Sequence, residues 1–462
     1  MTSLIVELSK FVFILFIAMY TFLSFSVLRK KNQEEINHGW RVQNLLTVLI
    51  QVLACVVLLA QTEQEGQEKL LLFFLFQIVL LQAAVFFTRV LYPGVSRLVL
   101  NHMCFLMAVG FIMLTRLSYD KAVRQFQIAA VALALSMLIP VLIRKGAFLQ
   151  KMSWFYGIAG LLLLVAVSFF GKTTSGAKLA IVLGSFSFQP SEFVKISFVL
   201  FAAARLVRST EFRELLATTV MAGIHVLVLV VSRDLGGALL FFTAYLVIFY
   251  VATKKPLYFL GGLGAGCGAA FAGYHLFSHV RVRVLAWTDP FSVIDKEGYQ
   301  ITQSLFAVGT GHWLGMGLNQ GMPGKIPVVE QDFIFSAISE EFGGIFAICL
   351  ILICMSCFIM FINIAMQIKN VFYKYTALGL GILYGFQVFL TVGGAIRFIP
   401  STGVTLPLVS YGGSSLTASI MMFAIIQGMY LLKEDEAIQS EKERAAKSKI
   451  RKNRKKQIGK KS

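Results

Sequence analysis

Residues 279–344 read HVRVRVLAWTDPFSVIDKEGYQITQSLFAVGTGHWLGMGLNQGMPGKIPVVEQDFIFSAISEEFGG and follow a strongly apolar run at 257–277. The stretch is long, mixed in charge and rich in Gly, Asp, Gln and Trp, whereas the sequence on both sides is mostly apolar. A polar loop of that length between apolar segments is uncommon unless it carries function. It leads to Asp332, where an acidic side chain adjoins the next apolar run, and we expect the chemistry of the protein at this boundary.

The composition of the 462-residue chain is that of an integral membrane protein, because 57% of the residues are hydrophobic, 14% are charged and 42 are Phe. The formal net charge is +19. In a protein with many membrane spans, such an excess more often reflects Lys and Arg in cytoplasmic loops than a surface for nucleic acid. We therefore expect the membrane, and no nucleic acid, as a partner of this chain.

Apolar segments recur along the whole chain, and each approaches or exceeds the roughly 20 residues that cross a bilayer as a helix. They predict an all-α polytopic membrane protein with about 13 transmembrane helices. The predicted spans are 9–28, 41–60, 70–90, 98–117, 126–143, 153–171, 191–207, 214–232, 236–253, 257–277, 333–365, 374–396 and 408–432.

Lys and Arg gather in alternate loops, which predicts how the spans are oriented. The basic loops are 29–41, 89–97, 144–151, 205–213, 254–255 and 369–374. Because cytoplasmic loops are enriched in Lys and Arg, the N-terminus is predicted outside, the C-terminus inside and the large loop 278–332 outside. Residues 433–462 form a basic cytoplasmic tail. From residue 444 on, we expect this tail to be disordered and held against anionic lipid headgroups. Docking of a cytoplasmic partner is the alternative role of the tail.

Several charged residues fall within or beside the predicted spans, where they are costly and usually mark a cavity or an ion pair. Glu192 and Lys195 are three residues apart and would lie on the same side of a helix. Arg233 and Asp234 precede Leu-Gly-Gly, where a helix would break. For both pairs, an internal salt bridge that holds helices together is the alternative to a functional role.

Two further places are unusual for a membrane segment. Glu340 and Glu341 lie one to two turns inside the span that begins after Asp332. Arg397 ends another span and leads into a stretch rich in Pro, Gly, Ser and Thr, whose non-helical backbone is tolerated at that depth only when it lines a cavity or is buried in protein. Asp332 has no Lys or Arg within six residues, so it is a candidate general base, the alternative being a plain surface carboxylate.

Seven motifs in this order resemble the SEDS family (RodA, FtsW and SpoVE), bacterial membrane glycosyltransferases that polymerise lipid II into peptidoglycan. The resemblance extends from MLTRLSYDKAVRQF at 113–126 to the last span, and the final block is the most specific part of it. The other motifs are FQPSEFVK (188–195), RDLGGAL (233–239), WTDPF with GYQITQSLFAVGTG (287–311), GLNQG (317–321), DFIFSAISEEFG (332–343) and GGAIRFIPSTGVTLPLVSYGGSS (393–415).

The resemblance implies a fold and a reaction. A ten-helix core at 96–432 would follow about three additional helices at 1–95. The GlcNAc 4-hydroxyl of the acceptor lipid II would attack the anomeric carbon of the donor MurNAc, with inversion and departure of undecaprenyl pyrophosphate. The essential Asp of the family falls on Asp332, which would act as the general base.

The resemblance also implies how the rest of the site is used. Arg397 and Lys195, with Arg233 behind them, would stabilise the leaving pyrophosphate, and Arg281 and Arg283 could help at the outer face. The further substrate-binding candidates are Glu192, Asp234, Glu341, Ser401, Thr402, Ser410 and Ser414. A divalent cation, Mg²⁺ or Mn²⁺, near the pyrophosphate is left open, and no protein-bound metal is expected. The expected partner is a class B penicillin-binding protein, a transpeptidase, in the bacterial cell membrane.

The sequence departs from the family at one place: Leu179 and Ala180 stand where an Arg-Trp pair is common. This departure keeps an inactive scaffold that recruits a transpeptidase as an alternative function. The polar groups at several depths of the predicted spans keep a lipid II flippase or another transporter as a second alternative. Roles in division, elongation and sporulation are not separable from these residues.

Overall fold

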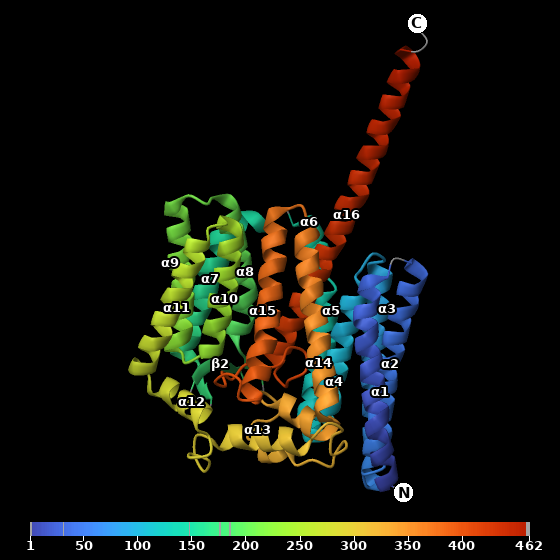
Figure 1. Cartoon of the computed structure of the whole chain (residues 1–462), viewed down its shortest axis with the longest axis vertical. Coiled ribbons are helices and arrows are strands. Elements are labelled where there is room, and N and C mark those ends of the chain that lie inside the picture. The colour runs from blue at the N-terminus through green and yellow to red at the C-terminus, as the bar shows by residue number, and fades with distance from the viewer. Residues whose placement is uncertain (1, 31, 147, 175–176, 184–185, 459–462) are drawn as a thin grey trace.

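The computed structural model describes residues 2–30, 32–146, 148–174, 177–183 and 186–458, and it is a bundle of long, mostly parallel helices (Figure 1). The first half contains α1 (Thr2–Arg29), α2 (Gln33–Leu59), α3 (Gln64–Leu91), α4 (Arg97–Leu117), α5 (Tyr119–Ser136), α6 (Ile139–Lys145), η1 (Leu149–Met152), α7 (Ser153–Phe170), β1 (Lys172–Thr174), β2 (Ala177–Leu183) and β3 (Phe186–Phe188). The second half contains α8 (Pro190–Arg208), α9 (Phe212–Val231), α10 (Leu235–Thr253), α11 (Pro256–Leu276), α12 (Ser278–Thr288), α13 (Tyr299–Thr310), η2 (Pro323–Lys325), α14 (Ile334–Gln367), α15 (Val371–Ala395) and α16 (Gly413–Ile458).

All of the predicted spans coincide with helices. Within the described residues, 12 helical segments are long and apolar enough to cross a membrane. The predicted span at 191–207 corresponds to α8, which is missing from those 12 because it carries Glu192, Lys195 and two Arg residues. This helix packs against α7, α9, α10, α15 and α16, so protein surrounds Glu192, Lys195 and Arg205, whereas Arg208 is exposed at its end.

The helices alternate in direction, and the chain ends lie at opposite ends of the bundle (Figure 1). The basic loops predicted to be cytoplasmic join helices at the end where α16 leaves the bundle, whereas 278–332 lies at the other end. Three regions differ from the sequence-based prediction. The loop 278–332 contains α12 and α13, residues 172–188 include a small antiparallel sheet in the order β1-β2-β3, and α16 continues as a helix to Ile458 where a disordered tail was expected.

The centre of the bundle is formed by α4, whose membrane-crossing window is fully buried. It packs against α2, α3, α5, α14 and α16. The three N-terminal helices form a separate group that lies against α14 and α4 (Figure 1). This arrangement puts α14, which begins two residues after Asp332, between the N-terminal helices and the rest of the bundle.

α14 consists of two helical pieces, 334–342 and 344–367, because Gly343 has φ 88° and ψ 169°. We call residues 334–342 the half-helix. The break removes the two hydrogen bonds that the N–H groups of residues 344 and 345 would make within a continuous helix. Residues 312–317 replace them. The N–H groups of Gly344 and Ile345 now donate to the carbonyl oxygens of His312 (2.8 Å) and Trp313 (3.2 Å). The carbonyl oxygens of Glu340 and Glu341 now accept from the N–H groups of Met316 (2.9 Å) and Gly317 (2.9 Å).

This geometry predicts that Gly343→Ala strongly destabilises the protein. The positive φ disfavours any residue with a side chain, and a Cβ atom at this position would lie 2.4 Å from the backbone nitrogen of Gly315. We expect a loss of about 2–4 kcal/mol in the free energy of unfolding, measured by thermal unfolding in detergent. The matched control is Gly268→Ala in α11, where a Cβ atom meets nothing within 4 Å. Equal stability of the two variants would contradict the role of Gly343.

Candidate functional site

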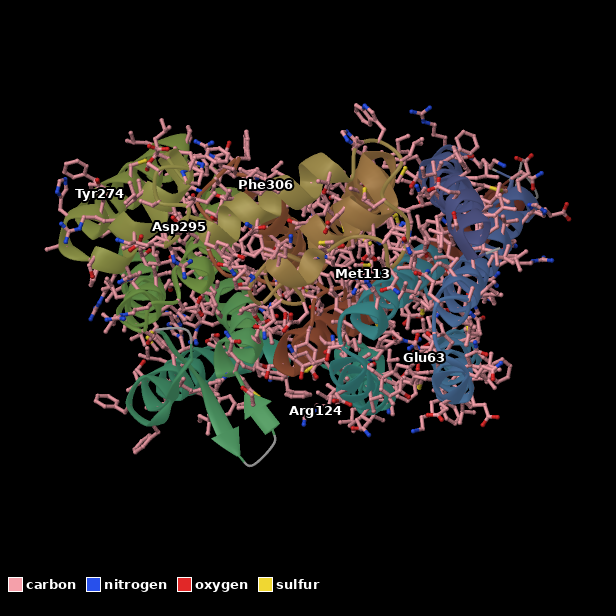
Figure 2. The ribbon with its side chains drawn as sticks, turned by 90° about the horizontal axis from the view of Figure 1, so that it is seen from below. Glu63, Met113, Arg124, Tyr274, Asp295 and Phe306 are labelled. Atoms are coloured by element: carbon pink, nitrogen blue, oxygen red, sulfur yellow. The ribbon has the colours of Figure 1, made fainter. Side chains whose placement is uncertain are left out.

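The candidate site lies at the end of the bundle that carries α12 and α13. Figure 2 looks onto this end, with Asp295 of the connecting loop and Phe306 of α13 labelled. The turn between α9 and α10, the non-helical segment 396–412 and the start of α14 meet there. The close approach of Gly236 to this segment shows how tightly they pack, since a Cβ atom at Gly236 would lie 2.2 Å from Val404 and 3.1 Å from the carbonyl oxygen of Thr402.

Asp332 and Arg283 come together over Gly403. A Cβ atom at Gly403 would lie 3.6 Å from Oδ2 of Asp332 and 3.8 Å from a terminal nitrogen of Arg283. Arg283, on α12, also donates a hydrogen bond to the carbonyl oxygen of Ser401 (2.9 Å). The hydrogen bond to Ser401 fixes the guanidinium on the non-helical segment beside the carboxylate, and the φ of 73° at Gly403 favours glycine there.

The surroundings of Asp332 favour its protonated form more than water does. Burial raises its pKa from 3.8 to about 6, the charge of Arg283 opposes this rise, and Glu330 adds to it. Burial likewise lowers the pKa of Arg283, while the charges of Asp332 and Asp234 oppose that shift. A carboxylate with a pKa near 6 is ionised at neutral pH and is a better proton acceptor than an exposed one, as a general base requires.

A second group of polar residues begins at Asp234, which caps α10 by accepting a hydrogen bond from the N–H of Gly237 (2.7 Å). Burial raises the pKa of Asp234, hydrogen bonds from Gly237 and Ser191 oppose the rise, the charge of Glu192 increases it and that of Arg283 opposes it. Arg283 therefore acts on both Asp332 and Asp234. These contacts connect the base candidate with the start of α8.

Lys195 lies deeper along α8 and is buried. Its ammonium donates to Oε2 of Glu192 (2.6 Å) and to Oε1 of Gln387 (2.9 Å). Gln387 in turn donates to the carbonyl oxygen of Thr405 (2.9 Å). The predicted proximity of Glu192 and Lys195 is thus confirmed, and the pair joins α8 to α15 and to the non-helical segment.

Three of the four hydroxyl groups predicted from the sequence as substrate-binding candidates have clearly different surroundings. Ser410 donates to the carbonyl oxygen of Gln331 (2.6 Å), next to Asp332, and Ser414 accepts a hydrogen bond from the N–H of Gln189 (2.9 Å). The hydroxyl of Thr402 is buried and has no hydrogen-bond partner within the described part of the chain. An unsatisfied buried hydroxyl is costly, so Thr402 is the member of this set with spare capacity for a ligand.

Arg397 and Arg233 both have positive φ, 60° and 65°. Arg397 donates to the carbonyl oxygens of Trp287 and Thr288, both at 2.7 Å, at the end of α12. The charge of Arg233 acts on His279 of the same helix. Both arginines therefore lie near α12, and among the hydrogen bonds of the described residues none joins Arg397 to Lys195.

Glu341 is completely buried and holds the loop before α14 in place. Its carboxylate accepts hydrogen bonds from Nε of Arg116 (2.8 Å) and from the N–H of Asn319 (3.0 Å). Glu340 accepts one from the N–H of Met322 (2.9 Å). These contacts give Glu341 a structural role and do not connect it with the group around Asp332.

Two residues gain importance only in the structure. Arg283 was one of two candidates at the outer face, and the contact over Gly403 selects it over the exposed Arg281. Gln387 was missed, although a Gln in an apolar span is itself a signal. Ala180 is buried in β2, and the side chain of the neighbouring Leu179 lies outside the described part of the chain.

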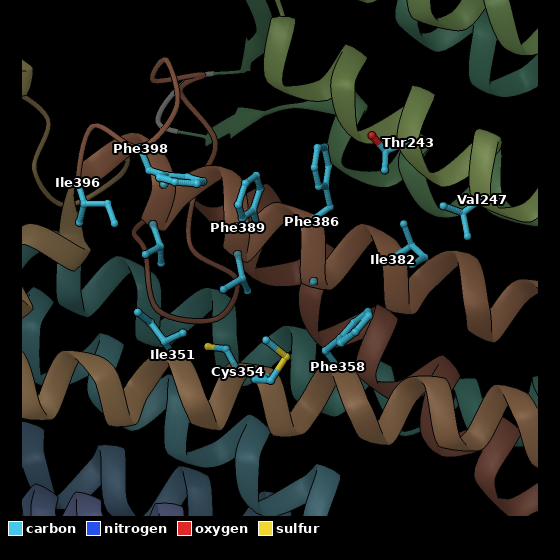
Figure 3. A pocket seen from close by; sticks show the side chains of 15 residues that line it. Thr243, Val247, Ile351, Cys354, Phe358, Ile382, Phe386, Phe389, Ile396 and Phe398 are labelled. Atoms are coloured by element: carbon cyan, nitrogen blue, oxygen red, sulfur yellow. The ribbon is translucent and has the colours of Figure 1, made fainter. Parts of the chain in front are cut away.

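A largely apolar pocket of about 400 Å³ lies beside this site, between α10, α14 and α15 (Figure 3). Its walls include Phe358, Phe386 and Phe389, and it reaches Ile396 and Phe398, the two neighbours of Arg397. Among the described residues, no group of three or more His, Cys, Asp or Glu side chains could hold a metal ion.

Comparison with known proteins gives consistent matches. A family model described as "Cell cycle protein", for FtsW, RodA and SpoVE, matches residues 96–433. The chain is 34% identical over 366 residues to "Peptidoglycan glycosyltransferase RodA" of Mycobacterium tuberculosis, covering 72% of this chain and 77% of the relative. It is 34% identical over 284 residues to "Probable peptidoglycan glycosyltransferase FtsW" of Tolumonas auensis, covering 58% and 73%.

Solved structures share the fold. One, described as "Structural coordination of polymerization and crosslinking by a peptidoglycan synthase complex", contains a chain that is 26% identical, with a TM-score of 0.62 over 74% of this chain and 98% of that chain. The crystal structure of Thermus thermophilus RodA matches with a TM-score of 0.57 and 24% identity, over 73% of this chain and 97% of that one.

The raised pKa of Asp332 predicts how its replacement changes stability. Because the pKa of about 6 in the fold exceeds the ordinary 3.8, the stability that Asp332 contributes is fully present below about pH 4 and is lost as the pH rises through 6. Asp332→Asn, which stays neutral, should therefore stabilise the protein at pH 8 by about 1–2 kcal/mol, with little gain near pH 4. Thermal unfolding at both pH values measures this, with exposed Asp295→Asn as the control. A gain that does not depend on pH would contradict the raised pKa.

Proposed function

The chain belongs to the FtsW, RodA and SpoVE family, and we infer that it is a peptidoglycan glycosyltransferase of cell-wall synthesis. We propose that it polymerises lipid II into glycan strands and releases undecaprenyl pyrophosphate. The observation that carries the proposal is the carboxylate of Asp332, held beside Arg283 at the end of the bundle, with a pKa near 6.

In the proposed reaction, Asp332 accepts the proton of the GlcNAc 4-hydroxyl of one lipid II as that oxygen attacks the anomeric carbon of the donor MurNAc. A new C–O bond forms, the bond from that carbon to the pyrophosphate oxygen breaks, and the configuration inverts. Arg283 keeps the carboxylate ionised before attack. Its bond to Ser401 fixes the guanidinium, so that its positive charge stays close to the carboxylate.

The leaving pyrophosphate carries charge that the site must stabilise. Arg397 is the favoured cation, because it is only partly buried and lies beside the apolar pocket, whose lining suits part of the hydrocarbon chain of such a lipid. Lys195 is a weaker candidate since Glu192 already neutralises it. The hydroxyl of Thr402 could donate to the same anion. A divalent cation carried by the pyrophosphate would stabilise the same charge.

The chain is a multi-pass membrane protein, and we propose the bacterial cell membrane as its location, with the N-terminus outside and the C-terminus in the cytoplasm. The common side of the basic loops supports this orientation. We also propose a class B penicillin-binding protein, a transpeptidase, as its partner. The support is that a structural relative is described as part of a complex for polymerisation and crosslinking.

Asp332→Asn should abolish strand synthesis, with a loss of at least about 100-fold, because the amide cannot take the proton. The measurement is incubation of the purified protein with labelled lipid II, with and without the partner, followed by gel separation of glycan strands. Asp295→Asn, the same change at an exposed position, should keep wild-type activity. Equal polymerisation by Asp332→Asn would exclude Asp332 as the base, whereas lipid transport without glycan product in the wild type would favour a flippase.

The rate of strand synthesis should rise with pH through about 6 as Asp332 ionises. Removing the positive charge in Arg283→Gln raises the pKa of Asp332 further, so this rise should move to higher pH by about one unit. The variant would then lose more activity at pH 6 than at pH 8. Arg281→Gln, two residues away and exposed, is the control and should leave the profile unchanged. An unshifted profile in Arg283→Gln would mean that the two side chains do not interact.

A further inference from the structure

The three N-terminal helices, which lie outside the family match at 96–433, are bound to the core by specific contacts. Tyr20 of α1 hydrogen-bonds to His102 of α4 (3.0 Å), and His102 hydrogen-bonds to Ser356 of α14 (3.0 Å). Phe13 packs edge-on against Phe342, the last residue of the half-helix, with ring centroids 4.9 Å apart. These buried contacts fix α1–α3 in one position against α14.

Gln61, in the turn between α2 and α3, binds the loop that precedes η2. Its amide nitrogen donates to the carbonyl oxygen of Leu318 (3.0 Å), and its amide oxygen accepts from the side chains of Asn319 (3.2 Å) and Gln320 (2.8 Å). The same amide nitrogen bonds to Val57 at the end of α2 (3.0 Å), which fixes the side chain on its own helix. One side chain therefore holds three consecutive residues of the loop.

That loop is bound to the half-helix on its other side. Residues 316 and 317 bond to the carbonyl oxygens of 340 and 341, and the carboxylates of Glu340 and Glu341 accept from the N–H groups of Met322 and Asn319. The half-helix begins at Ile334, two residues after Asp332, and joins the rest of α14 only through Gly343. Its orientation therefore depends on the loop that Gln61 holds.

We propose that α1–α3 act as a built-in positioning element for Asp332, with Gln61 as the positioning residue. Gln61 holds loop 318–320, the loop holds the half-helix, and the half-helix sets where the carboxylate of Asp332 lies relative to Arg283 and the acceptor hydroxyl. This proposal rests on the proposed role of Asp332 as the base. The effect is on the rate of the chemical step and not on substrate binding, because none of the atoms that Gln61 contacts belongs to the proposed substrate site.

The first experiment compares Gln61→Ala with Gln67→Ala in the purified full chain, using lipid II as substrate. Gln67 is the matched control because its amide bonds only to the carbonyl oxygens of Leu59 and Thr62, within the same turn, and does not reach loop 318–320. We expect Gln61→Ala to lower kcat by about tenfold with KM within about twofold, since a small misplacement of a catalytic group is costly. Gln67→Ala should keep both constants. Wild-type kcat in a folded Gln61→Ala protein would overturn the proposal.

A second set of variants removes two of the three contacts between Gln61 and the loop from the loop side and leaves the bond to the carbonyl oxygen of Leu318. Asn319→Gly with Gln320→Ala deletes both donors to Gln61, and glycine tolerates the φ of 66° at position 319. This pair of changes should also lower kcat by about tenfold. Because both sets break one interaction, combining them should cause no further loss, whereas independent effects would multiply to about 100-fold. Multiplying effects would contradict a shared contact.

The activity of Asp332→Asn shows whether a failure lies in the positioning role of Gln61 or in the proposed function itself. If Asp332→Asn remains active, the assignment of the base fails whatever Gln61 does. If Asp332→Asn is inactive while Gln61→Ala has wild-type kcat and KM, the base stands and only the positioning role fails. Thermal unfolding of each variant shows that losses of rate occur in folded protein.

Discussion

The break in α14 at Gly343 can exist only because residues 312–317 supply the hydrogen bonds that the break removes. Two N–H groups and two carbonyl groups lose their helical partners there, and at this depth neither lipid nor loosely bound water could satisfy them. The loop that supplies the replacement hydrogen bonds is itself held by the buried carboxylates of Glu340 and Glu341, which accept hydrogen bonds from its N–H groups. Asp332 stands just before the half-helix that these bonds fix, so its position depends on them.

The charges at the site form a connected series. Arg283 influences both Asp332 and Asp234, Asp234 influences Glu192, and Glu192 pairs with Lys195. Each charge has a neighbour of opposite sign, which reduces the cost of holding it among apolar helices. At Asp332 burial outweighs the effect of the cation and the pKa rises to about 6, and burial raises the pKa of Asp234 as well. A carboxylate with a pKa near 6 is ionised at neutral pH and accepts a proton more readily than a carboxylate with the ordinary pKa.

Local patterns in the sequence predicted much of this, and long-range contacts account for the rest. Apolar length alone located every span, and the three-residue spacing of Glu192 and Lys195 was enough to predict their pairing. Arg283 could not be assigned to Asp332, because their contact depends on how α12 packs over Gly403. The structural role of Glu341 was also hidden, since its partner Arg116 lies on α4. The short sheet at 172–188 gave no period-2 pattern strong enough to recognise.

The central claim is that Asp332 is a partly buried carboxylate with a raised pKa, close to the charge of Arg283 and ready to accept a proton. Its titration can be followed directly by infrared difference spectroscopy of the purified wild type and of Asp332→Asn across pH 3–9. The account predicts a carboxyl band that titrates near pH 6 in the wild type and is absent from the variant. A wild-type spectrum in which the only signal lost in the variant titrates near the ordinary value of 3.8 would contradict it.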